Sequence, residues 1–256
     1  MSGAIAGDII GSVHEGAGTK TKRFPLFDRH ARFTDDTVLT VAVAESILHG
    51  TDLIGLFHDY FHRYPQAGFG GSFIQWAVER RREAYNSWGN GSAMRVSPVG
   101  FACDTLDHVM QHAARTAAVT HNHPEGIRGA QATAAATFLA RTGSDKLAIK
   151  QRITEAFGYD LSTPLDVIRE TYEFDLSCQG SVPQSIAAFL EATDFEDAIR
   201  NAISLGGDAD TMACIAGAIA DAYWGIPEEI ERRTLSLLDD HLRGVVEDFS
   251  RQFRRP

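Results

Sequence analysis

Two short acidic clusters near opposite ends of the chain each lead directly into an apolar segment. Residues 33–37 read F-T-D-D-T and precede the apolar residues 38–44, whereas residues 206–211 read G-G-D-A-D-T and precede the apolar residues 212–220. Both apolar segments have the composition of a buried helix. Each acidic cluster is therefore expected in a first helical turn, where unpaired backbone N–H groups and the helix dipole favour negative charge.

The side chains of these clusters offer oxygen atoms only, which suits a hard cation. Carboxylate and hydroxyl oxygens are preferred by magnesium, manganese and calcium and not by thiophilic metals. Either cluster alone would also serve as a helix N-cap, because Thr and Asp accept hydrogen bonds from the first backbone N–H groups. Four carboxylates at the starts of two buried helices would repel one another without a counter-charge. The pair of clusters therefore predicts a shared metal site, with simple capping as the alternative.

The length and composition of the chain favour one large domain over two small ones. The chain has 256 residues, of which 44% are hydrophobic, so it can bury a full core. No stretch rich in Pro, Ser or charge interrupts it, and the two acidic clusters that need each other lie near its opposite ends. The formal net charge of −10 argues against a nucleic-acid-binding surface. The basic residues 80–82 are interpreted as the solvated face of a helix, with a phosphate contact as the alternative.

The cysteines and the N-terminal segment predict a soluble, cytoplasmic protein. Cys103, Cys178 and Cys214 are far apart and odd in number, which fits free buried thiols in a reducing compartment. The first apolar residues lack a basic leader and contain Asp8, so they do not resemble a signal peptide. No apolar run reaches the length of a membrane span. The oligomeric state is not readable from the sequence, and a monomer is the default expectation.

Helical patterns dominate the chain, and no segment shows the sustained polar and apolar alternation of a strand. We therefore expect an all-α fold in which residues 1–256 form a single domain. Besides the helices that follow the two acidic clusters, helices are predicted at residues 3–13, 52–62, 73–84, 104–118, 125–141, 144–157, 163–173, 179–190 and 194–204, with one closing helix after Pro227.

A glycine stripe in the first predicted helix indicates which helices meet at the centre. Gly3, Gly7 and Gly11 recur at four-residue spacing, which places three bare backbone patches on one helix face. The helix after Asp210 is also built from small residues, so these two helices are expected to pack together. Asp8 would then be buried, and we interpret it as a cap for a neighbouring helix in preference to a metal ligand.

Three further segments carry residues suited to an anionic or aromatic ligand. Residues 67–72 form a glycine-rich turn before a helix, which exposes backbone amides to a phosphate or serves only as a turn. Trp88 lies in a small polar loop, where it is either a core residue or a stacking platform for a nucleobase. His121 and His123 precede a proline; no further His or Cys completes a zinc site, and a phosphate contact by one histidine is at least as plausible.

In their shared order, six segments resemble the ADP-ribosylglycohydrolase family of the dinitrogenase-reductase-activating glycohydrolase type, most closely its ADP-ribosylserine hydrolase branch. The resemblance covers nearly the whole chain. The matching segments are residues 7–15 (GDIIGSVHE), 34–37 (TDDT), 89–95 (GNGSAMR), 120–121 (TH), 181–183 (SVP) and 205–211 (LGGDADT).

The resemblance implies a compact orthogonal helical domain that holds two magnesium or manganese ions beneath an ADP-ribose cleft. The metal-ligand positions are Thr34, Asp35, Asp36, Asp208, Asp210 and Thr211. The substrate-binding positions are Gly70, Gly71 and Ser72 by the diphosphate and proximal ribose, Ser87, Trp88 and Asn90 by the adenosine, and His121 by a phosphate. Ser72 stands where the family often has glycine, and Trp88 where it often has tyrosine.

The chemistry implied by the resemblance is hydrolysis of the bond between ADP-ribose and a modified side chain or small acceptor. Two cations can fix the distal ribose and activate a water, with Asp35 and Asp36 in the catalytic centre. Glu15 matches the position of the group that protonates the leaving atom, with a movable metal ligand as the alternative. We expect an O-linked serine acceptor slightly more than an N-linked arginine. The competing hypotheses are a catalytically idle ADP-ribose-binding module and a calcium-stabilised structural protein.

Overall fold

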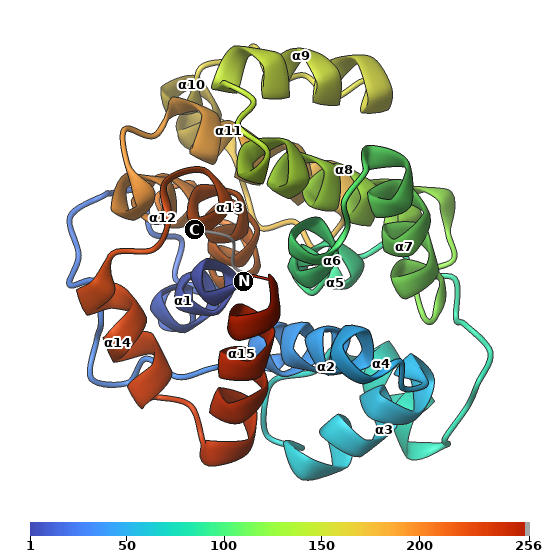
Figure 1. Ribbon diagram of the computed structural model, residues 1–256. Helices are drawn as coiled ribbons and strands as arrows, with labels where there is room; N and C mark the ends of the chain where they lie inside the picture. The colour runs from blue at the N-terminus through green and yellow to red at the C-terminus, as the bar shows by residue number, and fades with distance from the viewer. Residues whose placement is uncertain (254–256) are drawn as a thin grey trace.

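Two helices built from small and apolar residues lie side by side at the centre of the molecule (Figure 1). In the computed structural model, which describes residues 1–253, these are α1 (Ser2–Gly11) and α13 (Ala209–Trp224). A Cβ atom on Gly7 would lie 2.0 Å from the carbonyl oxygen of Ala213, and one on Gly3 would lie 2.4 Å from that of Gly217. The glycine stripe is therefore required for this close approach, as the sequence predicted.

The other helices surround this central pair, and the expected all-α class is confirmed. The described residues contain no strand beyond an isolated antiparallel bridge between Gly89 and Ser177. The surrounding helices are α2 (Asp35–His49), α3 (Leu53–Arg63), α4 (Gly71–Val78), α5 (Gly91–Met94), α6 (Ser97–Ala102), α7 (Leu106–Ala118), α8 (Pro124–Arg141), α9 (Lys146–Phe157), α10 (Leu165–Thr171), α11 (Cys178–Glu191), α12 (Phe195–Ile203), α14 (Glu228–Ser236) and α15 (Asp240–Phe253).

Two apolar clusters form the core, and four helices, α1, α5, α8 and α13, contribute to both of them. Ile10 of α1 and Ile215 of α13 belong to one cluster, whereas Ile9 and Cys214, their neighbours in sequence, belong to the other. Helix α8 contributes in the same way, with Ala132 in the first cluster and Ala134 in the second. Because the same helices bury side chains on both sides, the two clusters belong to one helical domain.

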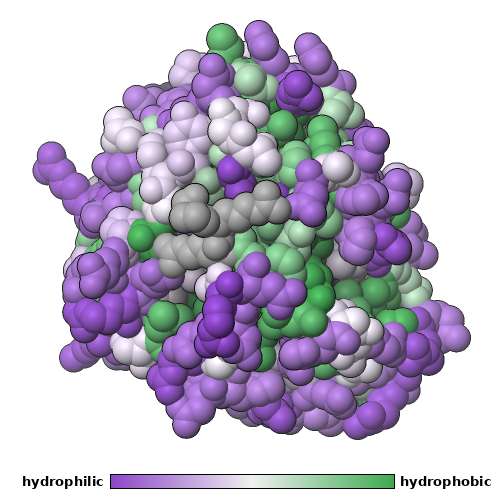
Figure 2. All heavy atoms as spheres, in the orientation of Figure 1, coloured by the Kyte–Doolittle hydropathy of each residue, from purple (hydrophilic) through white to green (hydrophobic). Residues whose placement is uncertain are grey.

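The face of the molecule drawn in Figure 2 is largely hydrophilic. Figure 2 shows hydrophilic residues around most of the outline of one face, with hydrophobic residues gathered nearer its centre. Within residues 1–253, no helix combines the length and the apolar character needed to cross a membrane.

Helix α4 is shorter than the sequence predicted, and the three arginines that follow it lie outside any helix. The helix ends at Val78 and not at residue 84, and Arg80 has a φ of 49°. The turn brings the chain back so that the indole Nε1 of Trp76 donates to the carbonyl oxygen of Glu83 at 3.0 Å. The interpretation of residues 80–82 as a helix face is therefore wrong, although all three side chains are exposed.

The predicted closing helix is also wrong, because the segment forms two helices. Helix α14 ends at Ser236, and α15 begins at Asp240. The carboxylate of Asp239 accepts a hydrogen bond from the backbone N–H of Leu242 at 2.9 Å, which caps the new helix start. The short helices α5 and α6 were not predicted, since four to six residues carry too little periodicity.

Candidate active site

A cleft of about 410 Å³ opens where the first residues of α2, α4, α5 and α13 come together. The acidic cluster at each end of the sequence contributes to it, as expected for a single domain. All but one of the site residues predicted from the sequence line this cleft: Glu15, Thr34, Asp35, Asp36, Gly70, Gly71, Ser72, Ser87, Asn90, His121, Asp208, Asp210 and Thr211.

The start of α2 is held by hydrogen bonds from its own Thr34 and from Asp8 of α1. Thr34 Oγ1 accepts from the backbone N–H of Asp36 at 3.3 Å. The carboxylate of Asp8 accepts from the backbone N–H groups of Thr34 and Thr37 at 2.9 and 3.1 Å, from Thr34 Oγ1 at 2.6 Å and from the Thr37 hydroxyl. Asp8 is therefore the buried cap of a neighbouring helix that the sequence analysis predicted.

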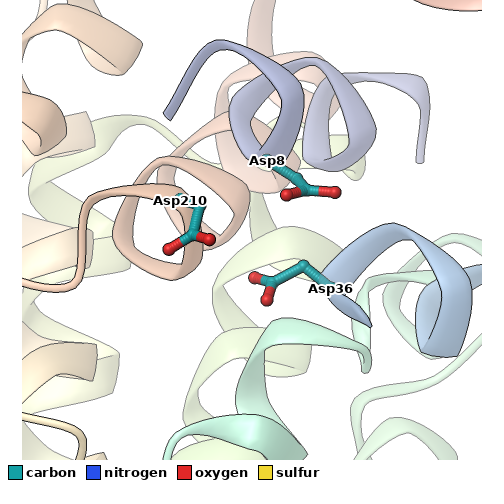
Figure 3. A group of neighbouring side chains, drawn as sticks. All are labelled: Asp8, Asp36 and Asp210. Atoms are coloured by element: carbon teal, nitrogen blue, oxygen red, sulfur yellow. The ribbon is translucent and has the colours of Figure 1, made fainter. Parts of the chain in front are cut away.

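Three carboxylates from three helices face a common space. Figure 3 shows Asp8 on α1, Asp36 at the start of α2 and Asp210 at the start of α13, with their carboxylate groups turned toward one another. One oxygen from each lies within 4.8 Å of the others. A second group, Glu15, Asp208 and Asp210, satisfies the same distance. Asp210 belongs to both groups, so two neighbouring cation positions could share it.

Burial and mutual repulsion make these carboxylates difficult to ionise without a counter-charge. Desolvation and the charge of Asp210 raise the pKa of Asp36 well above its usual value. Desolvation and the charge of Asp208 do the same to the pKa of Asp210. Desolvation and the charge of Asp8 raise the pKa of Asp35 to about 8. The all-oxygen donor set therefore fits a divalent cation, which would offset the repulsion.

The hydrogen bonding of Asp36, considered apart from the pKa values, also indicates a ligand-binding position. Its Oδ1 atom is buried and has no hydrogen-bond partner within residues 1–253, whereas Oδ2 accepts from Thr211 Oγ1 at 3.2 Å. A buried, unpaired carboxylate oxygen costs free energy unless a ligand satisfies it. Asp8, by contrast, already accepts four hydrogen bonds, so Asp36 and Asp210 are better placed to ligate an ion.

The start of α13 has no side-chain cap, and the preceding glycines fix its approach to the cleft. Gly206 has a φ of 72°, a value that favours glycine. A Cβ atom on Gly207 would lie 2.4 Å from Cε1 of Tyr172. The carboxylate of Asp208 accepts from Asn90 Nδ2 at 2.7 Å, so the loop before α5 positions it. The glycine pair is thus a steric requirement for placing Asp208 and Asp210.

Glu15 reaches the cleft from the segment that follows α1. Partial desolvation and the negative charge of Asp208 raise the pKa of its carboxyl group, while the positive charge of Arg32 lowers it. Lys20 fixes the far end of this segment, because its Nζ donates to the carbonyl oxygens of Tyr172 and Leu205 at 2.5 and 2.6 Å. A carboxyl group with a raised pKa retains a proton more readily, which suits a group that protonates a leaving atom.

Another part of the cleft lining is a glycine-rich helix start with polar side chains near it in sequence. Gly70 is the N-cap of α4, and Gly71 and Ser72 follow it in the first turn. Trp88 is the predicted site residue that does not line the cleft: it is 53% exposed, and its ring lies 5.6 Å from that of His123. The core interpretation of Trp88 is therefore wrong, and nucleobase stacking stays a prediction.

The two histidines of the sequence H-N-H have separate roles. His121 lines the cleft, whereas His123 is the N-cap of α8 and its Nδ1 accepts from the backbone N–H of Glu125 at 3.1 Å. Neither histidine belongs to a potential metal-binding group among the described residues. The structure therefore gives no support to a zinc site here.

Several residues that line the cleft were not predicted: Arg32, Tyr85, Arg95 and Leu176. The sequence could have indicated Arg95 as a cleft residue, since this charged residue directly follows the small residues 89–94, which read G-N-G-S-A-M. Arg32 and Leu176 had none, because they lie in irregular segments whose placement depends on tertiary packing.

The fold and the cleft define an all-α protein whose cleft is lined by a cluster of oxygen donors, by a glycine-rich helix start and by a histidine. The family model for ADP-ribosylglycohydrolases matches residues 1–256, so the chain belongs to that family. The expectation from the sequence is confirmed: this is an enzyme of the hydrolase class that acts on glycosidic linkages of ADP-ribose.

Comparisons with individual proteins agree with this family. The chain is 28% identical to ADP-ribosylhydrolase ARH3 of Xenopus tropicalis, covering 88% of this chain and 86% of that protein. It is 30% identical to ADP-ribosylarginine hydrolase Tri1 of Pseudomonas putida, covering 56% of this chain and 42% of that protein. A solved structure of an ADP-ribosylglycohydrolase-related protein complex superposes with a TM-score of 0.69, at 25% identity, covering 98% and 96% of the two chains.

Proposed function

We propose that this protein is a divalent-metal-dependent hydrolase that releases ADP-ribose from a modified side chain, with an O-linked serine as the preferred acceptor. The observation that supports it most is that carboxylate oxygens of Asp36 and Asp210, one from each acidic helix start, lie within 4.8 Å of each other inside the cleft. One acidic cluster alone would be an ordinary helix cap. Two clusters from distant parts of the chain that line the same cleft match the requirements of a binuclear site.

The residues that would hold two magnesium or manganese ions are those of the two helix starts. They are Thr34, Asp35, Asp36, Asp208, Asp210 and Thr211. When bound, such ions polarise the sugar and lower the pKa of a coordinated water. Thr34 is prepared for this role, because its hydroxyl donates to Asp8 and leaves an oxygen lone pair for a ligand.

The other cleft residues act on the substrate. Gly70 and Gly71 present the unobstructed start of α4 to the diphosphate, where a helix N-terminus favours negative charge. His121 contacts a phosphate, and Asn90 and Ser87 lie toward the adenosine. Glu15 donates a proton to the leaving oxygen as the glycosidic bond breaks, and the water that attacks the anomeric carbon supplies the new hydroxyl of ADP-ribose.

The charges at the cleft favour an O-linked acceptor over a guanidinium. Arg32 lines the cleft near Glu15 and lowers the pKa of that carboxyl group by its positive charge. Arg32 disfavours a second guanidinium beside it, and the carboxylates of the two helix starts are assigned to the metal ions. Among the described residues that line the cleft, this leaves Glu15 as the carboxylate that could pair with a guanidinium. Serine-linked ADP-ribose brings no positive charge, and its alkoxide leaving group gains more from protonation.

The decisive experiment compares hydrolysis of two ADP-ribosylated peptides, one modified on serine and one on arginine, with manganese or magnesium and after chelation. We expect metal-dependent release of ADP-ribose and a higher kcat/KM for the serine peptide. Hydrolysis that persists unchanged in chelator would contradict the metal assignment. A clear preference for the arginine peptide would contradict the acceptor assignment and leave the glycohydrolase activity intact.

The three cysteines bear on the compartment in which this reaction takes place. Cys103, Cys178 and Cys214 are all free, and the last two are buried. Free thiols are usual in a reducing compartment, so we propose a cytoplasmic enzyme that acts as a monomer on ADP-ribosylated proteins or small ADP-ribosyl conjugates.

A further inference from the structure

Arg95 is a buried cation beside the cleft that the proposed reaction does not yet use. It is only 1% exposed, lines the cleft, and lies over the ring of Phe57 at 4.6 Å. Within residues 1–253 its Nε and Nη1 atoms have no hydrogen-bond partner, and Asp35 acts on it by charge without forming an ion pair. Burying a guanidinium without a direct ion-pair partner costs free energy, so a function should explain why it is there.

The guanidinium of Arg95 is connected to His121 through one hydroxyl group. Its Nη2 donates to Thr120 Oγ1 at 2.8 Å and to the carbonyl oxygen of Thr116 at 3.3 Å. Thr120 Oγ1 in turn lies 2.7 Å from Nδ1 of His121. Thr120 is fully buried and His121 is 5% exposed, so water does not compete for these hydrogen bonds.

The positive charge of Arg95 favours one direction for these hydrogen bonds, in which Tyr85 also takes part through a side-chain hydrogen bond with Thr120. A guanidinium can only donate, so Thr120 Oγ1 accepts from Arg95. A proton on Nδ1 of His121 would lie next to the guanidinium's hydroxyl partner, whereas a proton on Nε2 lies on the far side of the ring. The positive charge of Arg95 therefore favours the arrangement in which Thr120 donates its hydroxyl proton to Nδ1 and Nε2 keeps the ring proton.

The free nitrogen of the ring faces the glycine-lined wall of the cleft. A Cβ atom on Gly91 would lie 3.2 Å from Nε2 of His121, and one on Gly89 would lie 3.7 Å from it. Both glycines line the cleft. Nε2 has no hydrogen-bond partner among the described residues and is not enclosed by them. The two glycines thus leave the space in front of Nε2 open to a ligand.

We propose that Arg95 is a positioning residue which, through Thr120, holds His121 in the tautomer whose Nε2–H group donates into the cleft, toward the diphosphate of ADP-ribose. This rests on the proposed function for the identity of the ligand. Burial and the charge of Arg95 also lower the pKa of His121 well below its usual value. The ring therefore acts as a neutral, oriented donor.

Thr120→Val tests the connection, because it removes the hydroxyl group at similar size and leaves both Arg95 and His121 in place. Thr116→Val is the matched control: its hydroxyl, one turn earlier, donates to the carbonyl oxygen of Ala113 and contacts neither residue. Thr120→Ser restores the hydroxyl and should restore the wild-type behaviour. Thermal unfolding of each variant confirms that it is folded before binding is measured.

The first measurement is the tautomer of His121 in the free protein, from the ¹⁵N chemical shifts of its two ring nitrogens. We expect a protonated Nε2 and an unprotonated Nδ1 in wild type, Thr116→Val and Thr120→Ser, and a mixed or reversed population in Thr120→Val and Arg95→Met. A protonated Nδ1 in the wild type, or an unchanged tautomer in a folded Thr120→Val variant, would overturn the proposal. This measurement needs no ligand and does not depend on the proposed function.

The second measurement is the dissociation constant of ADP-ribose in a double-mutant cycle. Thr120→Val should weaken binding by about tenfold, the scale of one hydrogen bond to a charged group, and Thr116→Val should not. In a His121→Ala background, Thr120→Val should have little further effect. An equal loss in both backgrounds would show that Thr120 acts only on the general structure. If the wild type itself does not bind ADP-ribose, the proposed function fails. The tautomer measurement would still test whether Arg95 orients His121.

Discussion

The two acidic helix starts have similar sequences but are satisfied in different ways. At α2, Thr34 caps the first turn and Asp8 from α1 accepts hydrogen bonds from its backbone and hydroxyl groups. At α13, no side chain caps the helix, and Asp208 accepts instead from Asn90 of a distant loop. The backbone at the start of α2 is therefore capped by side chains of the protein itself, whereas the start of α13 has no side-chain cap.

The same contrast separates two buried carboxylates that face each other in Figure 3. Both Asp8 and Asp36 are almost completely buried, at 0% and 3% exposure. Asp8 accepts four hydrogen bonds, while Asp36 accepts one and leaves Oδ1 without a partner. Burial alone therefore does not distinguish a structural carboxylate from a functional one. The number of donors supplied by the protein does.

The largest expected effect is on hydrolysis when one carboxylate is removed from either helix start. Asp35→Ala and Asp208→Ala should each abolish turnover and weaken metal binding, because each change removes an oxygen donor from the cleft without emptying the core. ADP-ribose release and metal titration calorimetry measure the two effects, and far-UV circular dichroism should show unchanged helix content. Activity retained by both variants in chelator-treated buffer would rule out the metal assignment.

Glu15→Gln is expected to have the next largest effect. Glu15 groups with Asp208 and Asp210 on the α13 side of the cleft, and its raised pKa suits a proton donor. The variant should lower kcat by roughly a hundredfold, the usual scale for a general acid, with little change in ADP-ribose affinity. If metal affinity fell in step with the rate, Glu15 would be a ligand and the acid would have to be another group.

Asp8→Ala should lower stability by about 3 kcal/mol, because two backbone N–H groups and two hydroxyl groups at the start of α2 would lose their acceptor. Chemical denaturation of the metal-free protein measures this loss. Since Asp8 is interpreted as a cap, the variant should keep a measurable affinity for manganese. Full stability together with complete loss of metal binding would identify Asp8 as a ligand.

Asp36→Ala should raise the stability of the metal-free protein, whereas Asp8→Ala should lower it, and the effect of Asp36→Ala should be the smaller of the two. Removing a carboxylate that Asp210, Asp8 and Asp35 repel should stabilise the metal-free protein by about 1 kcal/mol, as is common where function requires an unfavourable arrangement. Manganese should raise the melting temperature of the wild type and have much less effect on this variant. A loss as large as that of Asp8→Ala would remove the distinction between the two residues.

Local patterns in the sequence were sufficient for the features that depend on a few neighbouring residues. The start of α13 could be predicted from Asp208 and Asp210, and the contact between α1 and α13 from the spacing of Gly3 and Gly7, because helix-start chemistry and helix faces are set within one or two turns. The end of α4 could not be predicted, since Trp76 and Glu83 form their hydrogen bond only after the chain turns back.

The sequence by itself determined an all-α chain, the two acidic helix starts and the family to which their order points. Only the tertiary structure decided that Asp8 supports α2, that Glu15 joins Asp208 and Asp210, that Trp88 lies outside the lining of the cleft and that Arg95 connects to His121. These relations join residues that are far apart in the chain. Hydrogen bonding and burial depend on how helices pack, so residue identity alone does not fix which carboxylate is satisfied and which is left for a ligand.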